Sequence, residues 1–226
     1  MAIDRKKLAA WYDLTAPLYR ILRDDYDNGL VRRTAALLGE REGLRVLDAG
    51  CGTGLFTLGL GRCRPTWQIR GFDASPGMLA VAARQARKLS LAQVSLLRGD
   101  VDALPFADQS FDAVVAGGLF ANLEDPLPAL EQFRRVLRTN GKLVVVEYDR
   151  STMSSFTRRF FRLRILGYRL IALLVPRLRF SDAWSLEAST IEPSTFQERL
   201  GAAGFEPNPV ENVEEHMVFS ASPRTA

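Results

Sequence analysis

The chain has 226 residues, of which 47% are hydrophobic and 25% charged, with a mean hydropathy of −0.04. This composition excludes a disordered chain, a collagen-like fibre and an integral membrane bundle, and the length predicts a single domain over residues 1–226. No apolar run reaches the ~18–20 residues of a membrane-spanning helix, and the first residues lack the apolar stretch of a secretory signal. Two cysteines and one histidine are too few for a disulfide framework or an ordinary zinc site. We therefore expect a reduced, cytoplasmic protein without a metal.

Helical and β-type patterns alternate along the chain. Residues 4–38 have apolar residues at helical spacing, with Pro17 and Gly29 as expected breaks. Five β-type runs follow, at residues 45–48, 68–73, 94–98, 112–116 and 142–148. Three helical runs lie between them, at residues 55–61, 76–89 and 126–137, and Asn140-Gly141 is the expected stop after the last helix. This alternation predicts βαβ crossovers and a parallel sheet with helices on both faces.

The carboxy-terminal part begins with Glu192-Pro193-Ser194, which opens a helix expected to end at Gly201 or Gly204. Two β runs, residues 205–213 and 216–221, then flank a short turn and predict an antiparallel hairpin. The expected fold is α/β and Rossmann-like, with a seven-stranded, mostly parallel sheet whose last strand is antiparallel. Its expected parts are amino-terminal helices (1–40), a cofactor-binding core (41–150), a helical lid (151–192) and a helix with a hairpin (193–226).

The most informative stretch reads Val46-Leu47-Asp48-Ala49-Gly50-Cys51-Gly52-Thr53-Gly54. A buried strand runs into a glycine-rich turn and then a helix. Glycines let the backbone approach a ligand with positive φ, and the helix start behind them presents N–H groups. This pattern is typical of a nucleotide-type cofactor turn at the carboxyl edge of a parallel sheet. Its spacing differs from the G-x-G-x-x-G of dinucleotide sites, and it lacks the G-K-[ST] ending of a P-loop.

Two acids follow the next two β runs. Asp73 ends the second run, where a carboxylate can accept hydrogen bonds from both ribose hydroxyls. Asp100 follows the third run, where it can accept from an adenine amine while an apolar neighbour lies against the ring.

These residues resemble the class I S-adenosylmethionine-dependent methyltransferases. The match runs in register from about Val46 to Tyr148, through VLDAGCGTG, GFDAS, GDVDALPF, FDAVVAGGLF and LRTNGKLVVVE. The resemblance implies S-adenosylmethionine as the cofactor, with a nicotinamide oxidoreductase as the next interpretation. In the family's pattern the methionine part lies at Gly50, Gly52, Thr53 and Gly54, the ribose at Asp73, and the adenine at Asp100 and Val101.

Further cofactor contacts are expected near these residues. Asp48 is expected to hold the loop backbone from below, and Cys51 is assigned no catalytic role. Tyr12 and Tyr19 are expected to close over the donor from the amino-terminal helix, with packing on the sheet as the alternative. The remaining cofactor positions are Ala74, Met78 and Gly117.

The acceptor is suggested by the end of the fourth β run, Ala116-Gly117-Gly118-Leu119-Phe120. The [DNS]-P-P-[YF] motif of enzymes that methylate nucleic-acid amines is absent there. The resemblance is instead to the small-molecule and lipid branch that includes the ubiquinone/menaquinone biosynthesis methyltransferases, with a type 11 methyltransferase domain. The quinone enzymes tend to carry an Arg where this chain has Ala121, so no role of that Arg is carried over. Phospholipid headgroup N-methylation, natural-product methylation and a catalytically inactive cofactor-binding module remain alternatives.

Three residues are candidates for catalysis at the same edge. His216, the only histidine, starts the last strand and is a candidate base, with a hydrogen-bonded histidine at a sheet end as the alternative. Glu147 and Tyr148 end the fifth β run and are expected to shape the substrate pocket. The expected reaction is methyl transfer to a small lipophilic acceptor, such as a quinol or phenolic ring carbon.

The predicted lid has an unusual charge. Eight arginines and no acid lie within residues 150–181, so this segment carries +8 and the rest of the chain −4. On a helical wheel, Arg158, Arg162 and Arg169 fall within about 40° of one another, whereas Arg164 does not. A lid with solvated arginines, peripheral membrane contact through 151–180 and nucleic-acid binding are the three interpretations. We expect a lipophilic small-molecule substrate and no nucleic-acid partner, and leave the oligomeric state open.

Overall fold

The computed structural model describes residues 9–13, 16, 28–149, 151–152, 154–155, 159 and 191–224. The described strands are β1 (Arg45–Ala49), β2 (Gln68–Asp73), β3 (Val94–Arg98), β4 (Phe111–Gly117), β5 (Leu137–Tyr148), β6 (Phe205–Pro207), β7 (Glu211–Val213) and β8 (His216–Pro223). The described helices are α2 (Gly29–Leu38), α3 (Leu55–Cys63), α4 (Pro76–Lys88), the 3-10 helix η1 (Phe120–Asn122), α5 (Leu127–Val136) and α7 (Pro193–Ala202). Residues 9–13 are also helical. Tyr19 and most of the predicted lid, including Arg158, Arg162 and Arg169, lie outside the described residues.

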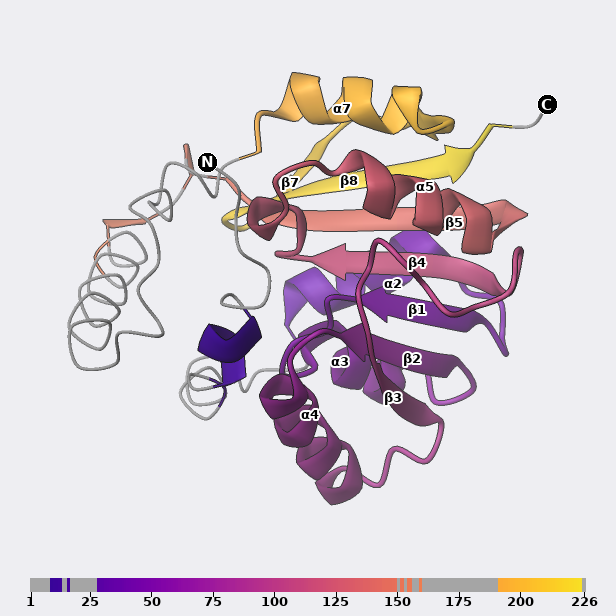
Figure 1. The fold of residues 1–226 in the computed structure, drawn as a ribbon, viewed down its shortest axis with the longest axis vertical. Coiled ribbons are helices and arrows are strands. Elements are labelled where there is room, and N and C mark those ends of the chain that lie inside the picture. Colours follow the sequence, from indigo (N-terminus) through magenta and orange to yellow (C-terminus); the bar gives the residue numbers. More distant parts are fainter. Residues whose placement is uncertain are drawn as a thin grey trace.

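The strands form one sheet in the order β3-β2-β1-β4-β5-β8-β6, and β7 also pairs with β8. Strands β1 to β5 are parallel, and β8 is antiparallel to β5, β6 and β7. The predicted α/β, Rossmann-like architecture is therefore confirmed. In Figure 1 the arrowheads of β1 and β4 point to one edge of the sheet, and the indigo residues 9–13 lie beyond that edge.

The strand predicted at residues 205–213 differs in the structure. The expected single run over residues 205–213 is two strands, β6 and β7, which pair with opposite ends of β8. Pro209 lies in the break between them, and proline has no N–H to donate to a continuous ladder.

The junction of α5 and β5 also differs from the prediction. Helix α5 ends at Val136 and β5 begins at Leu137, so Asn140-Gly141 lies inside the strand rather than at a helix stop. The pairing with β4 shifts register there, between Phe111 and Ala113. A Cβ on Gly141 would lie 2.8 Å from Leu137 Cδ2 and 2.9 Å from the Arg138 carbonyl oxygen, so the bend requires a residue without a side chain.

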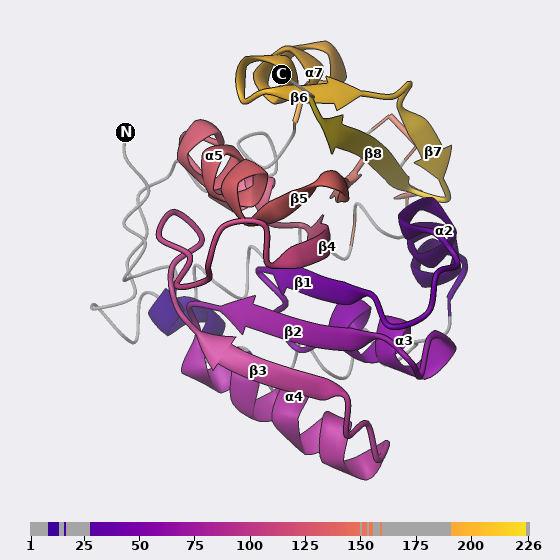
Figure 2. The same cartoon turned by 90° about the vertical axis from the view of Figure 1, so that its right-hand side faces the viewer.

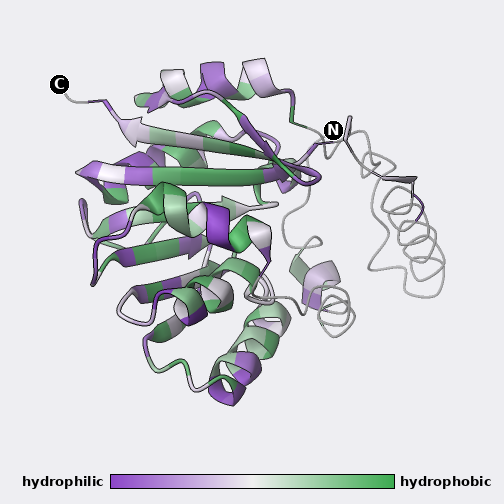
Figure 3. Ribbon diagram, turned by 180° about the vertical axis from the view of Figure 1, so that it is seen from behind, coloured by the Kyte–Doolittle hydropathy of each residue, from purple (hydrophilic) through white to green (hydrophobic). Residues whose placement is uncertain are grey.

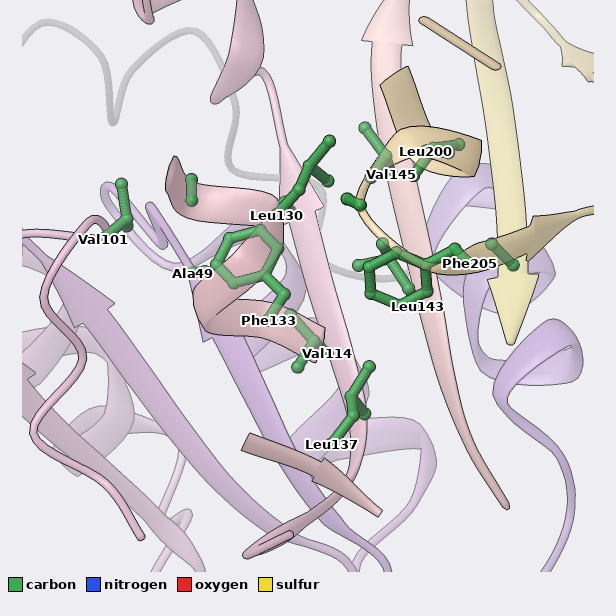
Figure 4. Close-up of a cluster of buried hydrophobic side chains, with 14 of the residues drawn as sticks. Ala49, Val101, Val114, Leu130, Phe133, Leu137, Leu143, Val145, Leu200 and Phe205 are labelled. Carbon is green, nitrogen blue, oxygen red and sulfur yellow. The ribbon is translucent and has the colours of Figure 1, made fainter. Parts of the chain in front are cut away.

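Hydrophobic side chains from both faces of the sheet form two core layers. On one face, Leu130 and Phe133 of α5 and Leu200 of α7 cover inward side chains of β4 and β5, such as Val114 and Val145 (Figure 4). The opposite face is covered by α2 and α3, as Figure 2 shows, and uses the alternate residues of the same strands. Figure 3 shows hydrophobic residues concentrated along the central strands. Each large buried side chain contributes about 1.5–3 kcal/mol, which fixes the strands and the loops at their ends.

The described helices include none whose length and apolar character would suffice to cross a membrane.

Candidate active site

The glycine turn is attached to the end of the neighbouring strand. The backbone N–H groups of Gly50 and Cys51 both donate to the Phe72 carbonyl oxygen, at 2.7 and 3.0 Å. Gly50, Gly52 and Gly54 all have positive φ, at 72°, 54° and 100°. A Cβ on Gly54 would meet Leu58 at 2.9 Å, whereas one on Gly52 would meet no described atom within 4 Å. The turn is therefore packed from behind and open at Gly52, which gives a ligand access to the backbone.

Asp73 lies directly against this turn. Its Oδ2 accepts a hydrogen bond from the Gly52 N–H and its Oδ1 accepts one from the Ser75 N–H, both at 2.8 Å. Burial raises the pKa of the Asp73 carboxyl above its usual value, although these two hydrogen bonds oppose the shift. Each carboxylate oxygen can accept more than one hydrogen bond, so the fixed carboxylate retains capacity for two ribose hydroxyls.

Asp48 has a different role from the one expected of it. Its Oδ2 accepts from the Thr57 N–H at 2.8 Å and the Thr57 hydroxyl at 2.5 Å, so it holds the first turn of α3 and not the backbone of residues 50–54. The reason is strand alternation, which turns Asp48 to the α3 face of the sheet. Its Oδ1 is buried without a hydrogen-bond partner among the described residues. Burial, followed by the charge of Asp73, raises the pKa of Asp48 to about 7, while the Thr57 bonds oppose the shift.

Cys51 Sγ is buried beside these acids. Burial raises the pKa of its thiol well above the usual value, and Asp48 and Asp73 raise it further. A thiol that stays protonated is a poor nucleophile.

The residues expected at the adenine follow β3. Asp100 is exposed, and its Oδ1 accepts from the Asp102 N–H at 3.1 Å. Val101 is buried in the core cluster that also contains Phe72. The structure thus brings both residues to the end of β3, beside the β2 strand that carries Asp73.

Three further expected cofactor residues have different environments. Ala74 is exposed next to Asp73, and Met78 is buried in the first turn of α4. A Cβ on Gly117 would lie 2.2 Å from Phe56 Cε2, so packing against that ring explains this glycine. Its neighbour Gly118, with φ of 63° and open space at its Cβ position, was not singled out from the sequence.

The segment of residues 9–13 contacts two loops at this edge. The Tyr12 hydroxyl donates to Asn122 Oδ1 of η1 at 2.9 Å. Asp13 Oδ1 accepts from the Ser75 hydroxyl at 2.5 Å and from the Gly77 N–H at 2.7 Å. Tyr12 therefore lies at the predicted edge. Asp13 and Asn122 were missed, because no sequence signal links them to distant partners, whereas the Ser75-Pro76 pair is a recognisable helix start.

The three predicted catalytic residues also lie near this edge. Tyr148 and His216 face each other in the β5–β8 pairing, with ring centroids 4.4 Å apart. Glu147 is only 3% exposed, and its Oε1 accepts from the Phe120 N–H at 2.8 Å. Glu147 thus holds the start of η1, whereas Tyr148 and His216 are half-buried.

This arrangement is a Rossmann-like fold with a candidate nucleotide-type cofactor site, formed by a glycine turn and the acid that ends the next strand. Residues 47–145 match the family described as "Methyltransferase domain". S-adenosylmethionine is the cofactor that this match indicates.

Known proteins extend this comparison. A demethylmenaquinone methyltransferase of Bacillus velezensis is 33% identical over 130 residues, which are 57% of this chain and 56% of the relative. The match thus spans little more than half the length of that curated relative. A crystal structure of a SAM-dependent methyltransferase from Aquifex aeolicus aligns with a TM-score of 0.68 at 18% identity, over 92% of this chain and 97% of the other. The [4+2]-cyclase SpnF aligns with a TM-score of 0.75 at 20% identity, over 97% and 96% of the two chains. Both structures share the fold.

Proposed function

We propose that this protein transfers the methyl group of S-adenosylmethionine to a small lipophilic acceptor, with the ring carbon of a quinol or phenol as the first candidate. The observation that carries the proposal is the Asp73 carboxylate, fixed by Gly52 and Ser75 beside an open glycine turn. The cofactor supplies an activated methyl group, so the protein contributes mainly binding and orientation.

Charge around the turn favours this cofactor over a dinucleotide. Asp48 and Asp73 lie beside the turn, and neither forms an ion pair within the part of the chain that the structure describes. A pyrophosphate would be repelled by the Asp73 carboxylate, and by Asp48 to the extent that it is ionised at its pKa of about 7, whereas a sulfonium with an amino group would be attracted. This supports S-adenosylmethionine and opposes the nicotinamide alternative.

We propose that the methyl acceptor binds beside Tyr148 and His216, and we call this part of the site its acceptor half. Two half-buried rings at the sheet edge, tilted by 35° to each other, offer aromatic contacts to a flat acceptor. His216 is proposed as the base that takes the proton from a phenol hydroxyl or from the methylated ring carbon. A ring acceptor is also supported by the name of the Bacillus velezensis relative, a demethylmenaquinone methyltransferase.

A shared fold does not decide the chemistry, because SpnF is a cyclase with a similar fold. Purified protein should therefore be incubated with isotope-labelled S-adenosylmethionine and three acceptor sets: demethylated quinols and simple phenols, phosphatidylethanolamine, and RNA. We expect label only in the first set, located by mass spectrometry. Label only in the phospholipid or in RNA contradicts the acceptor, and cofactor binding without any product indicates an inactive module. The Asp73→Ala variant serves as the control for background transfer.

We further propose a cytoplasmic location with peripheral membrane contact through residues 151–180, and no nucleic-acid partner. The proposal is supported by the eight arginines without an acid in residues 150–181. A lipophilic acceptor would be drawn from the same membrane surface.

A further inference from the structure

The segment of residues 9–13, here called the clasp, joins the two halves of the candidate site. Asp13 binds the start of α4 on the cofactor half, and Tyr12 binds Asn122 on the acceptor half. Trp11 is 1% exposed, so the clasp is packed down and does not merely touch the surface. In Figure 1 the clasp lies beyond the sheet edge to which β1 and β4 point.

A continuous chain of hydrogen bonds runs from the clasp to the glycine turn. The Ser75 hydroxyl donates to Asp13 Oδ1, the Ser75 N–H donates to Asp73 Oδ1, and Asp73 Oδ2 accepts from the Gly52 N–H. The Ser75 hydroxyl oxygen also accepts from the Met78 N–H at 3.1 Å and so caps α4. Ser75 is buried, and it is held by Asp13 through its hydroxyl while its N–H supports Asp73. Ser75 therefore couples the position of Asp13 to the support of Asp73.

Gly77 shows how closely the clasp approaches α4. A Cβ on Gly77 would lie 2.8 Å from Asp13 Cα and 2.9 Å from the Asp13 carbonyl oxygen. Gly77 lies in the first turn of α4 and has no positive φ, so its backbone would accept alanine, which is the better helix former. The close approach of Asp13 is therefore what requires glycine at this position.

We propose that Asp13 is a positioning residue for the cofactor: it docks the clasp on Ser75 and Gly77 and keeps Asp73 oriented for the ribose. This inference rests on the proposed function, because it assumes that the cofactor binds at Asp73. Both hydrogen bonds to Asp13 go to one oxygen, Oδ1, so the role depends on an acceptor at that place and not on a negative charge.

The single acceptor oxygen allows a matched experiment. In Asp13→Asn the amide oxygen can keep both hydrogen bonds, Asp13→Ala removes both, and Gly77→Ala forces the clasp away without removing a polar group. Gly201→Ala in α7 is the control, because its new Cβ would have only Arg224 Nη2 as a close neighbour, at 3.6 Å. Binding and dissociation of S-adenosylhomocysteine are measured by calorimetry and stopped-flow mixing. Hydrogen exchange of the peptide that contains Gly77 reports the docking of the clasp.

We expect Asp13→Ala and Gly77→Ala to bind S-adenosylhomocysteine about tenfold more weakly, mainly through faster dissociation, with faster exchange at Gly77. Asp13→Asn and Gly201→Ala should behave as the wild type does. Normal affinity and dissociation in Asp13→Ala and Gly77→Ala, despite faster exchange, would overturn the proposal and leave Asp13 a purely structural role. Equal weakening in Asp13→Asn and Asp13→Ala would also overturn it, because charge and not docking would then matter. Wild-type protein that binds no S-adenosylhomocysteine overturns the proposed function itself, and the inference with it.

Discussion

Asp73 and Gly52 lie 21 residues apart and are joined by a hydrogen bond of 2.8 Å from the Gly52 N–H to Asp73 Oδ2. The bond ties the acid at the end of β2 to the turn that follows β1. The two elements of the candidate cofactor site are thus preorganised as one unit, which reduces the ordering that a bound cofactor would have to impose.

Asp73→Ala should weaken the binding of S-adenosylmethionine and of S-adenosylhomocysteine by about 1.5–3 kcal/mol, because two ribose hydrogen bonds are lost. Calorimetry measures the effect. Asp108→Ala, which removes an exposed acid paired with Arg135, is the matched control and should leave the affinity unchanged. Unchanged affinity in Asp73→Ala would remove Asp73 from the site.

Asp48 should make the protein less stable as pH rises. Its pKa is about 7 when folded, against 3.8 as the ordinary value, so the folded state holds a proton that the unfolded state has lost between these limits. The stabilisation is therefore complete below about pH 3.8 and disappears as the pH passes about 7, with a slope of at most roughly 1.4 kcal/mol per pH unit.

Urea unfolding of wild type and Asp48→Asn across this pH range tests the assignment. The difference in the free energy of unfolding between the two proteins should change with pH, because the amide side chain of the variant carries no titrating proton. A constant difference would show that Asp48 titrates normally.

Substitution by alanine should affect two glycines of the candidate site in different ways. Gly117→Ala places a Cβ 2.2 Å from Phe56 Cε2 and should lower the free energy of unfolding by about 1–3 kcal/mol through overpacking. Gly52→Ala has space for its Cβ but keeps a positive φ, so strain should cost about 1–2 kcal/mol while the methyl group obstructs the open side of the turn.

Measurements of the free energy of unfolding and of cofactor affinity should therefore distinguish the two variants. Gly52→Ala should lose most of its cofactor affinity under conditions where it is fully folded. Gly117→Ala, once folded, should bind almost normally. If Gly52→Ala binds as well as wild type, the turn does not contact the cofactor.

His216→Gln should lower turnover of a phenolic acceptor by about 10²–10⁴-fold if His216 is the base, with unchanged affinity for S-adenosylhomocysteine. Tyr148→Phe retains the ring stack with His216 and is the comparison for loss of a hydroxyl alone. Steady-state kinetics with the labelled cofactor measures both variants. Normal turnover in His216→Gln would show that His216 is not the base and has only a structural role at the sheet edge.

Membrane contact should depend on the arginines of the predicted lid. Each arginine close to an anionic surface contributes about 1 kcal/mol, and the attraction should fade as the Debye length shortens from about 10 Å at 0.1 M salt to about 3 Å at 1 M. Flotation with anionic vesicles compares wild type with a variant in which Arg158, Arg162 and Arg169 are all changed to Glu. Equal flotation of the two proteins, or none by the wild type at low salt, would leave residues 151–192 as a lid only.

The sequence by itself determined the local elements and the cofactor turn. The boundaries of β2 and β3 agree with the runs at residues 68–73 and 94–98, because each strand is a contiguous β-type run with clear ends. The glycines after β1 and the acid at Asp73 were also recognisable, since each lies at the end of a β-type run, and the parallel pairing of β1 with β2 makes these ends neighbours.

Only the tertiary structure decided which side chains meet. Asp48 turns to Thr57 because of strand alternation, Tyr148 faces His216 because of the antiparallel register of β8, and Asp13 reaches Ser75 because the clasp lies beyond the sheet edge. Glu147 likewise holds η1 from inside the core. These partners are far apart in sequence or depend on which face a residue takes, so packing and register fix them, and no local pattern records the outcome.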